Sequence, residues 1–492
     1  MIVQNQFGIS VAPGLITVPG RVLDEPKVLY KDKKFALVRF GSWNMIDVKF
    51  NTTGTLKAWS YLIISLPTHR SPFDPAGPAV AVQKFTDTLI KTGISMAAPL
   101  PGQKLDLDSP EDARLDQRLE DASRKLDLLL VILPEAITPL YNRIKHYGDV
   151  KYGIHTVYSV GHKFAKCNDQ YFANVALKFN LKLGGNNQLL DSYRHGLIDE
   201  DKTIVVGIDV THPSPGSAAN APSIAGIVAS VDRWLGQWPA VLQIQSKARK
   251  EMVSDLTDML KSRLRVWKDP RHGKHAHLPE NILVYRDGVS EGQYQTVLQE
   301  EVPLLRQACE DIYPPADQKR GLPRLTVVIV GKRHHTRFYA SREGEADRSM
   351  NPKAGTVVDR GVTEARNWDF FLQSHAAIQG TARPAHYFVL LDEIFRARYT
   401  KAVPPPYQNV ADVLEALTQS MCYTYGRATK AVSLCTPAYY ADVVCERARC
   451  YLSEVFETPS QSVAGSVGGK PAEVTSEDVL IHARLRDSMF YI

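Results

Sequence analysis

The stretch TIVVGIDV, residues 203–210, decides the fold, because it is an almost continuous apolar run that ends near an aspartate and a His-Pro turn. Two similar runs follow it closely, SIAGIVASVD at 223–232 and AVLQIQ at 240–245. The segments that join the three runs are rich in turn residues and too short to hold a crossover helix. They therefore predict three antiparallel strands that follow one another in the sheet.

The pattern changes after the third run. A helix is expected at 250–268, the strand NILVYRD at 281–287, a second helix near 290–312, and the strands LTVVIV and HYFVLL at 325–330 and 386–391. Three consecutive strands followed by alternating helices and strands are the order of a ribonuclease H-like domain.

The preceding part of the chain, from about residue 34, alternates apolar runs with amphipathic stretches, which indicates parallel strand pairing. The apolar runs lie at 36–40, 58–66, 126–134 and 155–160, and helices are expected at 79–93, 138–153 and 168–185. The polar residues 98–125 are expected to form a surface excursion, residues 186–202 a domain boundary, and the Ser/Gly-rich residues 459–473 a mobile loop. The sequence thus predicts an α/β protein with a Rossmann-like domain before the ribonuclease H-like one.

Composition excludes several classes of protein. The 492 residues are 44% hydrophobic and 23% charged, which is typical of globular chains. The start, MIVQNQFGIS, does not resemble a signal peptide, and no apolar run reaches the length of a membrane span. The six cysteines include no C-x-x-C pair, which argues against a zinc site and for a reducing compartment. We expect a cytoplasmic monomer without membrane association, the nucleus being the alternative location.

The charge of the chain is concentrated in one region. The net charge is only +6, yet residues 141–185 carry seven Lys and Arg against two Asp, a local excess of +5. Tyr141 and Lys145 are four residues apart on one expected helix, and so are Lys178 and Lys182 on another, so each pair shares a helical face. Such faces can converge on a phosphate. For either pair alone, a lysine face exposed to solvent is the simpler interpretation.

Carboxylates mark the strand ends of the second domain. Asp209 lies near the end of the run at 203–210 and Asp287 ends the run at 281–287. A single aspartate at a strand end often only caps the next turn. Together with Glu251 and Asp442, however, these acids are candidates for binding two Mg²⁺ ions, which prefer oxygen ligands and can promote phosphodiester hydrolysis.

Five ordered strings closely resemble the PIWI domain of eukaryotic Argonaute proteins, and three upstream strings resemble the linker and MID domain of that family. The PIWI-like strings are GIDVTHP (207–213), YRDGVSEGQ (285–293), KRHHTR (332–337), SHAAIQGTARPAHY (374–387) and PAYYAD (437–442). The upstream strings are GRVLDEPKVLY (20–30), TPLYNRIK (138–145) and LKFNLKLGG (177–185). The resemblance implies a linker at 1–30, a MID domain at 31–190 and a PIWI domain at 191–492, the carboxyl-terminal half of a longer protein.

The resemblance also implies a function and a set of site residues. A small guide RNA would be anchored by its 5′ phosphate, and a complementary target RNA would be cut to leave a 3′ hydroxyl and a 5′ phosphate, with two Mg²⁺ or Mn²⁺ ions as cofactors. The implied catalytic residues are Asp209, Glu251, Asp287 and Asp442, with Asp209, Asp287 and Asp442 as metal ligands. The implied 5′-phosphate pocket contains Tyr141, Lys145, Thr156, Lys178, Lys182 and Arg447, and the next guide phosphates would contact Arg427, Ser433 and Tyr439.

Two positions depart from the pattern of many animal members. Asp442 stands where those members often have His, and an anionic oxygen ligand suits Mg²⁺. Val157 stands where many have Gln, which leaves the neighbouring Thr156 as the replacement donor. Tryptophan-rich silencing proteins are further candidate partners. The alternative function is a guide-binding scaffold that does not cut; a nucleotide-binding helicase is disfavoured because the chain has no G-x-x-x-x-G-K-[ST] loop.

Overall fold

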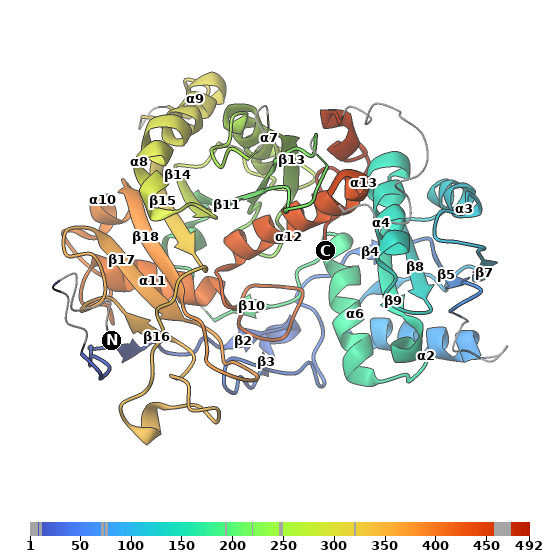
Figure 1. Cartoon of the computed structure of the whole chain (residues 1–492), viewed down its shortest axis with the longest axis horizontal. Coiled ribbons are helices and arrows are strands. Elements are labelled where there is room, and N and C mark those ends of the chain that lie inside the picture. Colours follow the sequence, from blue (N-terminus) through green and yellow to red (C-terminus); the bar gives the residue numbers. More distant parts are fainter. Residues whose placement is uncertain are drawn as a thin grey trace.

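The computed structural model describes residues 8, 12–69, 73, 77–191, 194–218, 220–245, 249–318, 321–456 and 474–492. These residues form two main β-sheets, each covered by helices, and Figure 1 shows helix α12 (Thr436–Tyr451) between them. The expected mobile loop at 459–473 lies outside the described residues. Over the residues described, no helix has the length and apolar character needed to cross a membrane.

The larger sheet contains the strands expected after residue 203. Its order over the described residues is β1-β16-β17-β18-β15-β14-β11-β12-β13. β11, β12 and β13 pair antiparallel in sequence order, whereas β11, β14 and β15 pair parallel, as the ribonuclease H-like order requires. The strands are β1 (Arg21–Val22), β11 (Thr203–Thr211), β12 (Ile224–Ala229), β13 (Ala240–Ile244), β14 (Asn281–Asp287), β15 (Arg324–Gly331), β16 (Thr356–Val358), β17 (Trp368–Gln373) and β18 (Ala385–Asp392).

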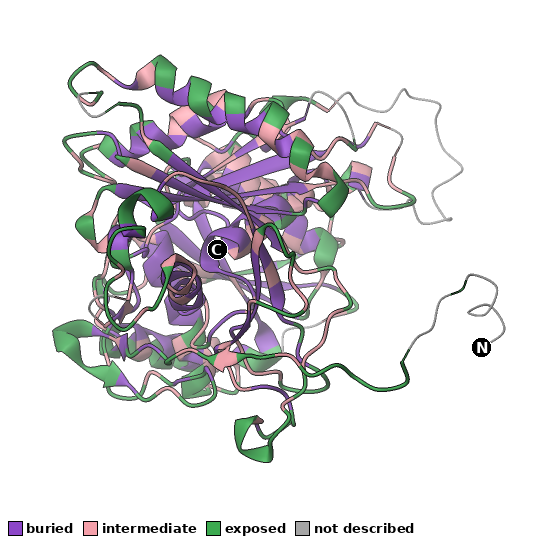
Figure 2. Cartoon of the chain, turned by 90° about the vertical axis from the view of Figure 1, so that its left-hand side faces the viewer, coloured by how far each residue is buried: buried purple, intermediate pink, exposed green. Residues whose placement is uncertain are grey.

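Both faces of this sheet are buried, because successive side chains of a strand point to opposite faces. On β14, Leu283 and Tyr285 pack into the core that contains α12 and α11 (Val410–Met421). Ile282 and Val284 pack into the opposite core with α7 (Leu256–Lys268) and α9 (Val302–Ile312). Figure 2 shows buried strands beneath helices whose outer faces are exposed.

The smaller main sheet is fully parallel, in the order β7-β5-β8-β9. Its strands are β5 (Trp59–Ser65), β7 (Gln103–Asp106), β8 (Leu128–Leu133) and β9 (His155–Val160). Along β8, Leu128, Leu130 and Ile132 face one core and Leu129, Val131 and Leu133 face the other. The first core holds α2 (Gly77–Lys91) and α6 (Asp169–Lys182), and the second holds α3 (Arg114–Ser123) and α4 (Thr138–His146). This three-layer arrangement confirms the Rossmann-like prediction.

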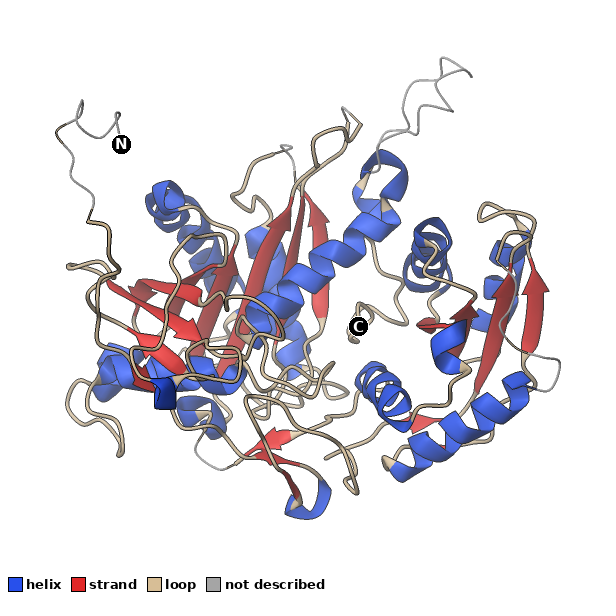
Figure 3. Ribbon diagram, turned by 60° about the horizontal axis from the view of Figure 1, so that its bottom comes forward, coloured by secondary structure: helices blue, strands red, loops and turns tan. Residues whose placement is uncertain are grey.

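Short elements connect the two sheets into one body. Strands β2 (Val28–Leu29) and β3 (Phe35–Ala36) form a small sheet with β10 (Leu189–Leu190), and β4 (Thr55–Leu56) pairs with β6 (Ser95–Met96). One hydrophobic core runs through both main parts, and it includes the last residues, Phe490, Tyr491 and Ile492. Figure 3 places this end of the chain between the two sheets. The remaining helices are short: η1 (Lys31–Lys33), η2 (Tyr147–Tyr152), α5 (Gly161–Phe164), η3 (Gly196–Glu200), η4 (Glu291–Gln293), α8 (Tyr294–Thr296), η5 (Val297–Glu301), η6 (Glu343–Glu345), α10 (Phe395–Tyr399), α13 (Ser453–Phe456) and η7 (Ser476–Val479).

Several local predictions were wrong. Residues 98–125 are not a surface excursion: they supply β7 and α3, whose Leu105, Leu115 and Leu119 are buried while polar residues cover their outer sides. The apolar run at 36–40 is strand only at Ala36. The helix expected from 250 begins at Leu256, and the sequence patterns also missed β16 and β17.

Gly207 lets α12 approach β11 closely, so its substitution is expected to be strongly destabilising. A Cβ atom at this position would lie 2.0 Å from the backbone oxygen of Pro437, in the first turn of α12. Relieving that overlap requires the helix or the strand to move, and overpacking of this kind costs about 3 kcal/mol. Urea unfolding of Gly207→Ala should show this loss. Gly344→Ala, whose new Cβ meets nothing within 4 Å, is the control; equal stability of the two variants would contradict the packing argument.

Candidate active site and anion pocket

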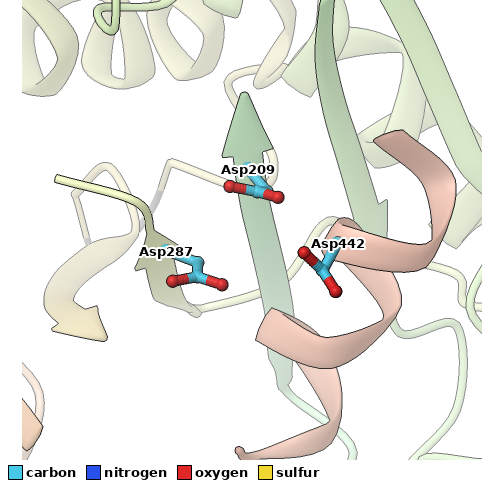
Figure 4. A group of neighbouring side chains, drawn as sticks. All are labelled: Asp209, Asp287 and Asp442. Atoms are coloured by element: carbon cyan, nitrogen blue, oxygen red, sulfur yellow. The ribbon is translucent and has the colours of Figure 1, made fainter. Parts of the chain in front are cut away.

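Three aspartates converge where β11, β14 and α12 meet. Each of Asp209, Asp287 and Asp442 offers a carboxylate oxygen, and the three atoms lie within 4.8 Å of one another (Figure 4). Asp209 shares a face of β11 with Gly207, and Asp287 shares a face of β14 with Tyr285, so both point toward α12. β11 and β14 are parallel neighbours, which brings their carboxyl ends to the same edge of the sheet. The structure thus brings together the three acids that the resemblance implied as metal ligands.

Two of the three crowded carboxylates, those of Asp209 and Asp287, are also buried, so a nearby cation would stabilise their charged forms. Burial raises the pKa of Asp209 well above its ordinary value, and the charge of Asp287 raises it further. Burial also raises the pKa of Asp287. Hard oxygen ligands held on a strand pair and a helix are the donor set that Mg²⁺ or Mn²⁺ takes, so the residues fit such ions.

Lys332 lies inside this acidic group. It follows β15, and its Nζ donates to Oδ2 of Asp287 at 2.9 Å and to Oδ1 of Asp442 at 3.0 Å. The surrounding carboxylates outweigh partial burial and raise the pKa of Lys332. In the sequence, Lys332 begins the string KRHHTR, from which its place among the acids could not be predicted.

Glu251, the fourth predicted acid, lies beside the triad on the segment before α7. Its Oε2 is 2.7 Å from Nε2 of His212, and its Oε1 accepts from Arg286 at 2.9 Å. A Cβ added at Gly288 would lie 3.2 Å from both Glu251 Oε1 and Asp209 Oδ1, so the two carboxylates border the same small space. Sequence reasoning missed His212 and Arg286 as partners of Glu251, although both stand in the quoted strings GIDVTHP and YRDGVSEGQ.

A second cluster, which we call the anion pocket, contains Lys145, Lys182 and Arg447 at the junction of the two sheets. Lys145 and Lys182 are each 2% exposed and Arg447 is 5% exposed. The Nζ of Lys145 donates to Thr156, at 2.7 Å to its backbone oxygen and 2.9 Å to Oγ1. Lys182 and Arg447 both donate to the backbone oxygen of Phe490. The cluster therefore joins α4, β9, α6, α12 and the end of the chain.

Asp149 is the buried counterion of the anion pocket. Its Oδ2 accepts from Arg447 at 2.7 Å and from the hydroxyl of Tyr451 at 2.8 Å, and the residue is 0% exposed. Sequence reasoning had counted Asp149 only as a charge to subtract from the basic region. Its carboxylate can offset one of the buried cations, and the others retain uncompensated charge, which is costly away from water.

Burial lowers the pKa of the lysines in and beside the anion pocket. Burial, with a smaller contribution from Arg447, lowers the pKa of Lys182 to about 7. Burial, followed by Arg427 and Arg447, lowers the pKa of Lys178 to about 8. The pKa of Lys145 is also lowered, by burial and then by Arg447 and Lys182. An arriving anion would reverse these shifts, because a nearby negative charge favours the protonated form.

Two cavities connect the predicted residues. One of about 540 Å³ is lined by Tyr141, Arg447, Arg427, Tyr439 and Asp442, so it extends from the anion pocket to the acidic triad. The other, about 580 Å³, is lined by Lys178 and shares Arg427 with the first. Ser433 is half-buried next to Val432, which lines the first cavity, whereas Val157 is buried in the core. A larger cavity of about 1320 Å³, near residues 394–419, is lined by none of the predicted site residues.

Comparison with known proteins identifies the family. Residues 128–453 match the model of the Piwi domain, and residues 2–30 match that of the Argonaute linker 2 domain. Protein argonaute 5 of Arabidopsis thaliana is 35% identical over 99% of this chain and 48% of its own length, so the chain spans about half of that relative.

Solved structures agree with this assignment. The MID-PIWI domains of N. crassa QDE-2 superpose with a TM-score of 0.65 at 32% identity, covering 90% of this chain and 100% of that one. Kluyveromyces polysporus Argonaute with a guide RNA gives a TM-score of 0.80 at 26% identity, covering 96% of this chain and 54% of that one. Together with the α/β architecture and the acidic triad, these matches show that the chain belongs to the Argonaute family and carries its second linker and PIWI domain.

Proposed function

We propose that this chain binds a small guide RNA by its 5′ phosphate and cleaves a complementary target RNA at the acidic triad. The observation that carries the proposal is the convergence of Asp209, Asp287 and Asp442 at one end of a cavity whose other end borders the anion pocket. A guide strand anchored in the pocket would run along that cavity, and a target strand paired with it would reach the triad. Base pairing would select the target, while the protein would contact the backbone.

The anion pocket supports the binding part of the proposal. Buried cations with an incomplete set of counterions favour a multiply charged anion, and a terminal phosphate offers up to two charges and several acceptor oxygens. Tyr141 contributes a hydroxyl that accepts from Arg447 at 3.4 Å. The residues proposed to hold the 5′ phosphate are Tyr141, Lys145, Thr156, Lys178, Lys182 and Arg447. Arg427, Ser433 and Tyr439 are proposed to contact the next phosphates along the guide.

For the cleavage part, Asp209, Asp287 and Asp442 are proposed to hold two Mg²⁺ or Mn²⁺ ions, with Glu251 completing the catalytic set. Such ions would activate a water and neutralise charge on the leaving oxygen. The chain's own residues would fix the geometry: Arg286 and His212 hold the Glu251 carboxylate beside Asp209, and α12 holds Asp442 against β11.

We also propose domain limits for these roles: a linker at 1–30, a MID domain at 31–190 and a PIWI domain at 191–492. The separate parallel sheet and its helices support the middle range. The linker contributes β1, which pairs with β16 of the large sheet, so it is integrated with the third range rather than free of it. The pocket would then lie between the second and third domains.

A binding comparison tests the anchoring role. The full chain should bind a 5′-phosphorylated guide RNA more tightly than the same RNA with a 5′ hydroxyl, measured by filter binding or anisotropy at one salt concentration. Because the backbone contacts are common to both RNAs, added salt should weaken both, while the difference reports the pocket. Equal affinity for the two guides would contradict the proposal.

The preference for the 5′ phosphate is expected to decline as pH rises above about 7. Lys182 and Lys178 have lowered pKa values of about 7 and about 8 in the free protein, whereas the guide phosphate, with a second pKa near 6, is already a dianion. Binding of the phosphate raises the lysine pKa values, so above pH 7 the lysines must take up protons when the guide binds. The free-energy cost of this proton uptake increases with pH. The affinity ratio of the two guides, measured from about pH 6.5 to about pH 9, should fall steadily.

The stability of the guide-free chain should change in the opposite direction. Between about 7 and its ordinary value of 10.5, Lys182 binds fewer protons when folded than when unfolded. Its contribution to the free energy of unfolding therefore rises with pH across this window. Urea unfolding of the chain and of Lys182→Met should reveal a steeper rise for the unsubstituted chain, and identical slopes would contradict the assigned pKa.

A further inference from the structure

Lys332 occupies a position that a metal ion would be expected to use. Its ammonium lies between Asp287 and Asp442, 2.9 Å and 3.0 Å from one oxygen of each, and the third acid, Asp209, raises its pKa further. Asp287 and Asp442 are also two of the three proposed metal ligands. Lys332 comes from the end of β15, so its side chain crosses from one strand to the end of β14 and to α12.

An ammonium group and a divalent ion would compete for the same pair of carboxylates. Mg²⁺ binds carboxylate oxygens at about 2.1 Å, well inside the distances at which Lys332 donates. An ion bound to both Asp287 and Asp442 would therefore lie against the ammonium, and the two positive charges would repel each other. The side chain of Lys332 is 31% exposed, so it has a route out toward solvent.

We propose that Lys332 is an internal counter-cation of the acidic triad, which holds Asp287 and Asp442 together before a metal ion binds and leaves when one does. The inference rests on the metal site proposed above. Its consequence is that metal binding includes the cost of releasing Lys332, so the apparent affinity is reduced by the fraction of molecules in which the lysine has left. In return, three crowded carboxylates stay ordered when no metal is bound.

Metal binding by Lys332→Met tests the inference. Titration with Mn²⁺, followed by electron paramagnetic resonance at fixed pH and ionic strength, should show at least tenfold tighter binding than in the unsubstituted chain. Lys261→Met is the matched control, because Lys261 also bridges two carboxylates, Asp258 and Asp311, at 2.8 Å and 2.9 Å. That variant should bind Mn²⁺ like the unsubstituted chain. Lys332→Gln, which keeps a neutral hydrogen-bond donor, should also bind Mn²⁺ more tightly than the unsubstituted chain. It replaces Lys332→Met in the experiment if the Met variant does not fold.

Thermal unfolding gives a second readout that does not depend on activity. Without metal, Lys332→Met should unfold at a lower temperature than the unsubstituted chain, because two carboxylates have lost their shared cation. In saturating Mn²⁺ the two should unfold at the same temperature, because the lysine no longer contacts the acids in either case. A difference that persists in saturating Mn²⁺ would show that lysine and metal do not replace each other, and would overturn the inference.

The outcomes separate this inference from the proposed metal site. Asp287→Asn should lose Mn²⁺ binding in all cases. If it does, and Lys332→Met binds Mn²⁺ no more tightly than the unsubstituted chain, the metal site stands and the counter-cation role is wrong. If the unsubstituted chain, Asp287→Asn and Lys332→Met all fail to bind Mn²⁺, the proposed metal site is wrong. The proposed role of Lys332 is then wrong as well.

Discussion

Asp209→Asn should reduce guide-directed target cleavage by at least about a hundredfold, because even residues that only orient metal ligands contribute 10–100-fold to metal affinity or activity. Asp209 is 7% exposed and contributes one of the three carboxylate oxygens that lie within 4.8 Å of one another. Asparagine keeps the size of the side chain but removes the charge that offsets a metal ion. Single-turnover cleavage of a labelled target by the guide-loaded chain measures the effect.

Target binding should survive the same substitution, since Asp209 is not proposed to contact the guide. Asp258→Asn, whose side chain is 82% exposed on α7, is the control and should cut normally. Cleavage by Asp209→Asn at the rate of this control would contradict the role of the triad. If the unsubstituted chain binds the target RNA but does not cut it, the result would instead favour the alternative function, a guide-binding scaffold that does not cut.

The second large effect is expected at Lys182. Lys182→Met should weaken binding of a 5′-phosphorylated guide by about 10- to 100-fold, because a hydrogen bond to a charged group contributes about 1.5–3 kcal/mol. Binding of the same guide with a 5′ hydroxyl should change little. The Met variant should also be at least as stable as the unsubstituted chain, since it removes a buried charge with a costly pKa shift and keeps similar volume.

This combination distinguishes a binding defect from unfolding. Lys166→Met provides the control, because Lys166 belongs to the same basic region of the sequence but is exposed. It should affect both guides equally and only slightly. An equal loss for phosphorylated and hydroxyl guides in Lys182→Met would place the contribution of Lys182 outside the 5′-phosphate pocket.

The strand ends indicated part of the site. TIVVGIDV and NILVYRD each place an aspartate at or near the end of an expected strand, which made Asp209 and Asp287 candidates. Their convergence depends on the parallel pairing of β11 and β14, which their spacing does not show. Asp442 was a candidate acid whose place beside them was implied only by the resemblance of PAYYAD to a family motif, since nothing in its spacing shows which sheet its helix crosses.

Long-range placement of charged side chains could not be predicted in this way. Lys332 follows an expected strand in the string KRHHTR, and the register of β15 beside β14 directs it to Asp287. Asp149 was counted only as a charge within a basic region, yet Arg447, nearly three hundred residues later, pairs with it in the core. Polar composition misled in the same way at 98–125, where a few buried leucines, not the many charges, determine the structure.

The position of the cut in a target RNA tests the central claim most directly. The full chain is loaded with a series of 5′-phosphorylated guides, each shifted by one nucleotide along the same end-labelled target, and incubated with Mg²⁺. The proposal predicts that the cut moves by one nucleotide with each shift, because the anion pocket and the triad lie at fixed ends of one cavity. A cut at a constant target position, or cleavage that needs no guide, would contradict it.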